Sequence, residues 1–241
     1  MTTSLDQLDL AHSGVIMPLT ITYHGHSTFL LDDGTHQVLL DPFHDDNPAC
    51  ETPADEINCT HILLSHGHED HMADAESIAK RCNATVFATH EITTYLGEVG
   101  VQGLEPGNTG GRITAPFGWI AFTPALHSSS FQGRYMGDPL GAVICMGGHR
   151  VYFAGDTALF SDMKLIRELY EPDIAILPIG DRFTMGPEHA TLAAEWISPK
   201  IVIPCHYDTW EPIQVDNKLF KPAGMITRFL APGESLNTDP D

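Results

Sequence analysis

The chain has 241 residues, of which 42% are hydrophobic and 18% charged, a composition typical of a folded protein long enough to bury a core. Its formal net charge is −20, because 32 acidic residues are balanced by only 12 Lys and Arg. This shortage of bases argues against binding of nucleic acid or anionic membranes, since both need clustered Lys and Arg. Histidine is the unusual component: 14 imidazoles outnumber all Lys and Arg, and histidine is the commonest metal ligand.

The N-terminal segment has neither a basic region nor a long apolar stretch, so no secretory signal is expected there. We expect residues 1–18 to form a poorly ordered leader. Five cysteines at irregular spacing favour reduced thiols and a cytoplasmic location, with a Cys50–Cys59 disulfide as the alternative. No run reaches the roughly 18 apolar residues of a membrane span.

From residue 19 onward, apolar strand-like runs come first and then alternate with helical periodicity. Strands are predicted over 19–23, 28–31 and 37–40, with the turn signal Asp32-Asp33-Gly34 between the last two. An acidic, proline-containing loop follows over 44–58. Helices are predicted over 72–82, 91–99, 161–170 and 187–197. The remaining strands are predicted over 61–64, 85–88, 112–123, 141–146, 151–154, 174–178 and 201–204. A glycine-rich turn is expected over 103–111 and a polar tail over 232–241.

This order of elements predicts a layered α/β domain with two sheets inside and helices outside. No linker divides the chain, so residues 19–241 are expected to form a single domain. Two phrases, VLLDPF and VYFAGDT, each carry a buried strand into an aspartate, which hints at two related halves.

The segment richest in chemistry is His66-x-His68-x-Asp70-His71, which follows a buried strand. Residues two apart in extended chain face the same side, so His66 and His68 can converge on one metal ion. Asp70 and His71 stand where the next helix starts and can turn toward a neighbouring point. Zinc, manganese and iron all accept these ligand types. The alternative interpretation is a polar loop that merely contains many histidines.

Three later strand ends each supply one further candidate ligand. These are His127, Asp156 and His206. A lone polar residue after a strand is usually structural. Three in the same context, following the histidine-rich loop, indicate a metal site at one edge of the sheets.

This ordered set resembles the metallo-β-lactamase superfamily, and more closely its branch of small metal-dependent hydrolases related to the L-ascorbate-6-phosphate lactonases. The resemblance runs from residue 19 to about residue 220. The phrases that carry the narrower match are GHSTFLL (25–31), LLDPF (39–43), ILLSHGHEDH (62–71), FAGDTALFSDM (153–163), LPIGDRFTMGPEHA (177–190) and IPCHYDTW (203–210).

The resemblance implies a four-layer αββα sandwich with two divalent metal ions along one edge. It assigns His66, His68 and His127 to one ion, Asp70, His71 and His206 to the second, and Asp156 to a bridge between them. Asp41 is expected to orient a ligand imidazole rather than bind metal, the alternative being a capping role before a proline. Zinc is the preferred metal, with manganese or iron as alternatives.

The expected activity is dinuclear hydrolysis, in which a metal-bound hydroxide attacks an ester, lactone or phosphodiester of a small molecule. Asp70 would also position the hydroxide, and His189 would donate a proton or contact substrate unless it is an ordinary first-turn helix residue. A cysteine is usual at the position of Asp156 in zinc β-lactamases, so Asp156 argues against antibiotic hydrolysis. The alternative function is a non-hydrolytic iron-binding or redox protein on the same fold.

Four further residues fit either a substrate contact or a structural role: His24, His26, Arg182 and Tyr207. The loop over 128–137 follows His127 and is either a pocket wall or an ordinary surface loop. Association into a homo-oligomer stays open, since compact relatives often form oligomers and the acidic composition does not decide the matter.

Overall fold

A computed structural model describes residues 17–238 of the chain. The expected leader over 1–18 therefore lies outside the described residues, apart from its last two positions. Within the described range, no helix has the length and apolar character needed to cross a bilayer.

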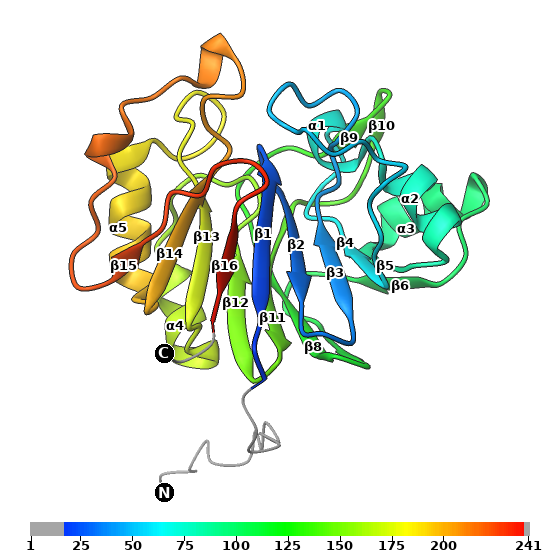
Figure 1. Cartoon of the computed structure of the whole chain (residues 1–241), viewed down its shortest axis with the longest axis horizontal. Coiled ribbons are helices and arrows are strands. Elements are labelled where there is room, and N and C mark those ends of the chain that lie inside the picture. The colour runs from blue at the N-terminus through cyan, green and yellow to red at the C-terminus, as the bar shows by residue number, and fades with distance from the viewer. Residues whose placement is uncertain (1–16, 239–241) are drawn as a thin grey trace, which may run out of the picture.

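Two seven-stranded mixed sheets form the centre of the molecule (Figure 1). The first has, in spatial order, β16 (Ser235–Asn237), β1 (Thr20–Gly25), β2 (Thr28–Asp32), β3 (Gln37–Leu40), β4 (His61–Leu63), β5 (Thr85–Thr89) and β6 (Leu104–Gly107). The second has β15 (Ile226–Thr227), β14 (Ile201–Cys205), β13 (Ile174–Pro178), β12 (His149–Phe153), β11 (Leu140–Met146), β8 (Gly118–Pro124) and β7 (Arg112–Ala115). The short strands β9 (Ser130–Phe131) and β10 (Arg134–Tyr135) pair with each other.

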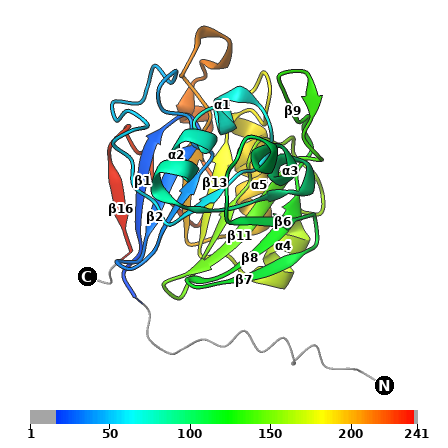
Figure 2. The same cartoon turned by 90° about the vertical axis from the view of Figure 1, so that its right-hand side faces the viewer.

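Helices cover the outer face of each sheet. The first sheet carries α1 (Glu69–Met72), α2 (Ala75–Cys82) and α3 (His90–Glu98), and Figure 2 shows α2 and α3 in front of its strands. The second carries α4 (Met163–Tyr170) and α5 (Pro187–Ile197), followed by the 3₁₀ turns η1 (Glu211–Ile213) and η2 (Asn217–Leu219). The predicted α/β sandwich of four layers is confirmed.

The inner strands, such as β11, β13 and β14, are apolar on both faces, because there the sheet is covered on both sides. In β12, Val151 and Phe153 enter the core between the sheets, whereas Tyr152 packs with α4 and α5. In β3, Leu40 likewise enters the inter-sheet core, and Leu39 belongs to the cluster beneath α2 and α3. This alternation produces three apolar clusters, one between each pair of layers.

The two sheets repeat one pattern of strand direction. In the first, β1, β2 and β3 pair antiparallel, and β4, β5 and β6 continue in parallel. In the second, β8, β11 and β12 pair antiparallel, and β13, β14 and β15 continue in parallel. VLLDPF and VYFAGDT contain the ends of β3 and β12, which occupy equivalent places in this pattern. The hint of two related halves in the sequence therefore agrees with the topology.

Several predicted boundaries differ from the structure. The helix expected over 72–82 begins only at Ala75, as α2, and the separate short helix α1 ends at Met72. Asp74 between them accepts a hydrogen bond from the backbone N–H of His44 at 2.6 Å. The strand expected over 112–123 is a hairpin of β7 and β8. The expected turn over 103–111 contains the edge strand β6, and the expected polar tail contains β16.

Candidate metal centre

The histidine-rich loop leaves the end of β4 and enters α1 at the edge of the first sheet. The Nε2 atom of His66 lies 2.9 Å from Nδ1 of His68. The ring of His127, which follows β8 in the other sheet, lies 5.1 Å from the ring of His66 and 5.0 Å from that of His68. One ligand atom from each of these three residues lies within 4.8 Å of the others. The structure thus brings together the three histidines expected around one ion.

A second group gathers around Asp70. Its Oδ2 atom lies 3.9 Å from Nε2 of His71 and 3.9 Å from Nε2 of His206, which follows β14. His26, from the turn between β1 and β2, also belongs to this group, and the ligand atoms of the four residues lie within 4.8 Å of one another. The three residues expected around the second ion therefore meet, with a fourth that the sequence left undecided.

Asp156 lies between the two groups. Its Oδ2 atom is 3.0 Å from Nε2 of His206, 3.4 Å from Nε2 of His71 and 3.6 Å from Nε2 of His127. The side chain is buried at the end of β12. One carboxylate therefore contacts imidazoles of both groups, which is the position that a bridging ligand occupies.

Asp41 and Ser65 fix the orientation of two rings from behind. The buried carboxylate of Asp41 accepts hydrogen bonds from Nδ1 of His71 at 2.7 Å and from Oγ of Ser65 at 2.6 Å. The Ser65 hydroxyl in turn lies 2.9 Å from Nδ1 of His66. Because both Nδ1 atoms are engaged, both Nε2 atoms face the centre. Asp41 takes the orienting position that the resemblance implied. Sequence reasoning missed Ser65, whose only signal is its place between the strand and His66.

The electrostatics of the centre favour positive charge. Burial acts to lower the pKa of His71, but the carboxylates of Asp156, Asp41 and Asp70 outweigh it and raise that pKa well above its ordinary value. Burial acts to raise the pKa of Asp156, but His206 and His71 hold it well below its ordinary value. Three carboxylates facing one ring thus make a site suited to a cation.

The unpaired atoms of the centre fit metal ligation. Within the described residues, Nε2 of His71 and Oδ1 of Asp156 are buried without a hydrogen-bond partner. An unsatisfied buried polar atom costs about 1–3 kcal/mol, and a bound cation would satisfy both atoms. Imidazole and carboxylate are ligands that zinc, manganese and iron share. The residues present therefore suit divalent metal ions.

His26 is the residue whose involvement the sequence left open. Its Nε2 atom lies 3.1 Å from Oδ2 of Asp70, and its Nδ1 atom lies 2.9 Å from Oγ1 of Thr209. Its ring lies 4.1 Å from that of His206. His26 thus holds Asp70 in place from a left-handed turn with φ of 56°. The Gly25-His26-Ser27 part of GHSTFLL pointed to His26 in the sequence, whereas nothing in the sequence singled out Thr209.

The other candidates are not gathered into this centre. His189 is exposed in the first turn of α5 and is absent from the metal-ligating clusters found within residues 17–238. Arg182 is exposed, with its Cζ atom 5.6 Å from the ring of Phe183. Tyr207 is half-buried at 6.2 Å from the ring of Phe229, and burial raises its pKa to about 12. His24 belongs to a separate cluster.

Comparison with known proteins places this geometry in a family. Residues 36–207 match the family described as Beta-lactamase superfamily domain. The UPF0173 metal-dependent hydrolase of Geobacillus thermodenitrificans is 46% identical over 226 residues, which cover 90% of this chain and 99% of that protein. The UPF0173 metal-dependent hydrolase TTHA1283 of Thermus thermophilus is 44% identical, covering 91% of this chain and 99% of that protein. The chain belongs to the UPF0173 metal-dependent hydrolase family.

A solved structure similar to this UPF0173 chain is Igni18, described as a novel metallo hydrolase from Ignicoccus hospitalis. It is 37% identical, covers 93% of this chain and 100% of its own, and superimposes with a TM-score of 0.85. The expected metallo-β-lactamase superfamily and the expected metal-dependent hydrolase class are both confirmed at the level of the family.

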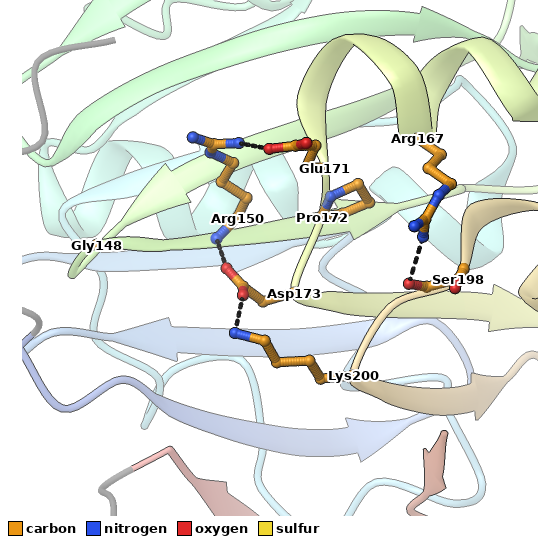
Figure 3. A pocket seen from close by; sticks show the side chains of 8 residues that line it. All are labelled: Gly148, Arg150, Arg167, Glu171, Pro172, Asp173, Ser198 and Lys200. Atoms are coloured by element: carbon orange, nitrogen blue, oxygen red, sulfur yellow. Dashed lines mark hydrogen bonds and ion pairs between the residues drawn. The ribbon is translucent and has the colours of Figure 1, made fainter. Parts of the chain in front are cut away.

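A polar pocket of about 450 Å³ lies at the opposite end of the second sheet, near the starts of β12, β13 and β14 (Figure 3). Its basic side chains are engaged in ion pairs and hydrogen bonds. Lys200 contacts Asp173 at 2.8 Å, Arg150 contacts Glu171 at 3.6 Å, and Arg167 donates to the carbonyl of Ser198 at 2.9 Å. These contacts tie the loops before the strands together, so the pocket belongs to the scaffold of this UPF0173 chain.

Proposed function

We propose that the chain is a dinuclear metal hydrolase acting on a small ester, lactone or phosphodiester. The observation that carries the proposal is the contact of one carboxylate, Asp156, with imidazoles of both groups at 3.0–3.6 Å. The proposed ligands are His66, His68 and His127 for one ion, Asp70, His71 and His206 for the other, and Asp156 for both.

Two divalent ions bound there would lower the pKa of a shared water from about 15.7 toward about 7 and polarise the scissile bond. The chain's own residues set the geometry for that chemistry. Asp41 and Ser65 keep the rings of His71 and His66 turned inward. Asp70 is the ligand with the more open carboxylate, 29% exposed, and its contact with His26 aims it at the centre. Asp70 is therefore the residue that positions the attacking water.

His189 is the proposed proton donor or substrate contact. It follows the segment 181–186, where the backbone N–H of Met185 donates to the carbonyl of Thr157 at 3.0 Å, next to Asp156. This contact draws the start of α5 toward the strand end that carries Asp156. We therefore propose that this exposed imidazole contacts a bound substrate without being a ligand.

The rim of the centre favours a small substrate with apolar character. Exposed Leu126 precedes His127, and the ring of Trp210, also exposed, lies 4.8 Å from the ring of His26. Recognition of a phosphate would need a basic side chain near the centre. Arg134, in the loop that follows His127, donates to Glu98 at 3.0 Å, so Arg182 is the base proposed for this role. Within the superfamily, we propose that the chain belongs to the branch related to the L-ascorbate-6-phosphate lactonases. This proposal is supported by the sequence segments from GHSTFLL (25–31) to IPCHYDTW (203–210).

The remaining attributes follow from the same chemistry. Zinc is the proposed metal, with manganese or iron as alternatives, because metal availability decides among ions that accept these ligands. All five cysteines are free thiols, which supports a reducing compartment and thus the cytoplasm. Residues 19–241 are proposed to act as one domain.

The test is elemental analysis together with a panel of esters, lactones and phosphodiesters. The wild type should bind two divalent ions at this centre and hydrolyse at least one substrate class after reloading with zinc or manganese. Asp156→Ala should lose bound metal and reduce hydrolysis to background, because it removes the shared ligand. Glu168→Ala, exposed on α4, is the matched control and should change neither property. Unchanged metal content and activity in Asp156→Ala would refute the bridging role.

A further inference from the structure

A second group of metal-ligating side chains, His24, His44 and Cys50, shares no residue with the candidate centre. His24 lies on β1, where alternation sends Tyr23 into the core between the sheets and His24 to the opposite face. His44 and Cys50 belong to the acidic loop over 44–58. One ligand atom from each residue lies within 4.8 Å of the other two, and the rings of His24 and His44 are 5.2 Å apart.

Both imidazoles have buried nitrogens without partners. His24 is 7% exposed, and neither of its ring nitrogens has a hydrogen-bond partner among residues 17–238. His44 is 2% exposed, and its Nδ1 lies 2.9 Å from the carbonyl of Thr52. Its Nε2 is buried and has no partner in the described part of the chain. A ring that donates Nδ1–H to a carbonyl keeps its Nε2 lone pair available, which is the usual arrangement of a metal-binding histidine.

The thiol completes a compact donor set beside these rings. Cys50 Sγ lies 3.3 Å from Nδ1 of His44 and 3.2 Å from the Thr52 carbonyl. Cys50 is only half-buried, so an ion can reach the site from solvent. The carboxylates of Asp74 and Asp45 lie close enough to His44 to oppose the lowering of its pKa by burial. Their negative charge also attracts cations to the loop.

We propose that His24, His44 and Cys50 bind a zinc ion that is separate from the catalytic ions. Two imidazoles and a thiolate are a zinc donor set, with a water as fourth ligand, and the thiolate discriminates against manganese and magnesium. Binding releases the Cys50 proton to solvent as the sulfur coordinates the ion. The ion would tie the loop over 44–58 to β1.

Cobalt substitution tests this proposal, because a thiolate bound to Co²⁺ gives a charge-transfer absorption that imidazole and carboxylate ligands do not give. Metal-free protein titrated with Co²⁺ should develop this band. Cys50→Ser should abolish it, and His44→Gln and His24→Gln should each weaken or abolish it. Cys145→Ser, a half-buried thiol outside the cluster, is the matched control and should keep the band.

Asp156→Ala should also keep the band, so failure of the proposed hydrolytic centre and failure of this site give different results. Elemental analysis of zinc-loaded protein should show one ion fewer in Cys50→Ser than in wild type. Circular dichroism of each metal-free variant reports whether the fold is intact. A wild type without the band, a band that survives in Cys50→Ser, or a band unaffected in both histidine variants would overturn the proposal.

Discussion

Asp41 and Ser65 show how residues without direct access to substrate decide the geometry of the proposed centre. The Asp41 carboxylate is fully buried, and its oxygens hold the backbone and hydroxyl of Ser65 as well as Nδ1 of His71. Burial raises the pKa of Asp41, and the neighbouring His71 opposes that rise. Because this site is buried, both the charge of Asp41 and its hydrogen bonds act strongly on the neighbouring groups.

Replacing Asp41 by asparagine separates these contributions. Asp41 has a left-handed backbone with φ of 42°, which asparagine also tolerates, so Asp41→Asn removes the charge without forcing the turn. We expect zinc affinity, measured by chelator competition, to fall about 10- to 100-fold, as for other residues that orient metal ligands. Asp33→Asn in the β2–β3 turn is the control and should keep wild-type affinity. Equal affinities in the two variants would contradict the orienting role.

The proposed ligands could be predicted from sequence because each follows a strand, and carboxyl ends of parallel strands converge at one edge. His127, Asp156 and His206 meet the histidine-rich loop for this reason. His26 could not be assigned in the same way. Its position depends on a left-handed turn and on a contact with Thr209, 183 residues further along the chain.

At the scale of elements, the strands buried on both faces were predictable, since their apolar runs are continuous. The edge strands β6 and β16 were not. Among the described strands, β6 pairs only with β5, and β16 pairs only with β1, near the other end of the chain. Such pairing is backbone hydrogen bonding between distant segments, which leaves no apolar pattern in the edge strand itself. The β9–β10 pair escaped prediction for a different reason: each strand has only two residues, too few to show an alternating pattern.

The segment containing β9 and β10 packs directly against the histidine-rich loop. A Cβ atom added at Gly67 would lie 2.4 Å from Cβ of Met136, and the Gly67 N–H donates to Oγ of Ser129 at 3.1 Å. Gly67→Ala should therefore push apart the two segments that carry His66 and His127. We expect weaker zinc binding and a lower thermal midpoint, measured by chelator competition and circular dichroism.

Gly97→Ala in α3 is the matched control for Gly67→Ala. Its added Cβ atom would meet only the flexible end of Leu104, at 3.3 Å, and alanine favours a helix more than glycine does. Its zinc affinity and thermal midpoint should match or exceed those of the wild type. If Gly67→Ala behaved like Gly97→Ala, the close packing of the 128–137 segment would have no bearing on metal binding.

At the scale of the whole molecule, the histidines make stability depend on pH. Burial lowers the pKa of eight histidines within residues 17–238, to about 4 for His24 and for His26. His71 is the opposite case, with a raised pKa. The eight histidines with lowered pKa values outnumber His71. At a pH between these lowered values and the ordinary pKa of 6.5, the unfolded chain therefore binds more protons than the folded chain.

Metal-free protein should therefore lose stability as the pH falls below 6.5, the ordinary pKa of histidine. A difference of one pKa unit corresponds to about 1.4 kcal/mol, so even two such rings contribute about 3 kcal/mol. The raised pKa of His71 works the other way: its contribution is complete below 6.5 and is lost as the pH rises through its folded pKa. Denaturant unfolding with a chelator present, at about pH 7.5 and about pH 5, measures the balance. Stability that is equal or greater at the lower pH would show that His71 and its carboxylates outweigh the eight buried neutral rings.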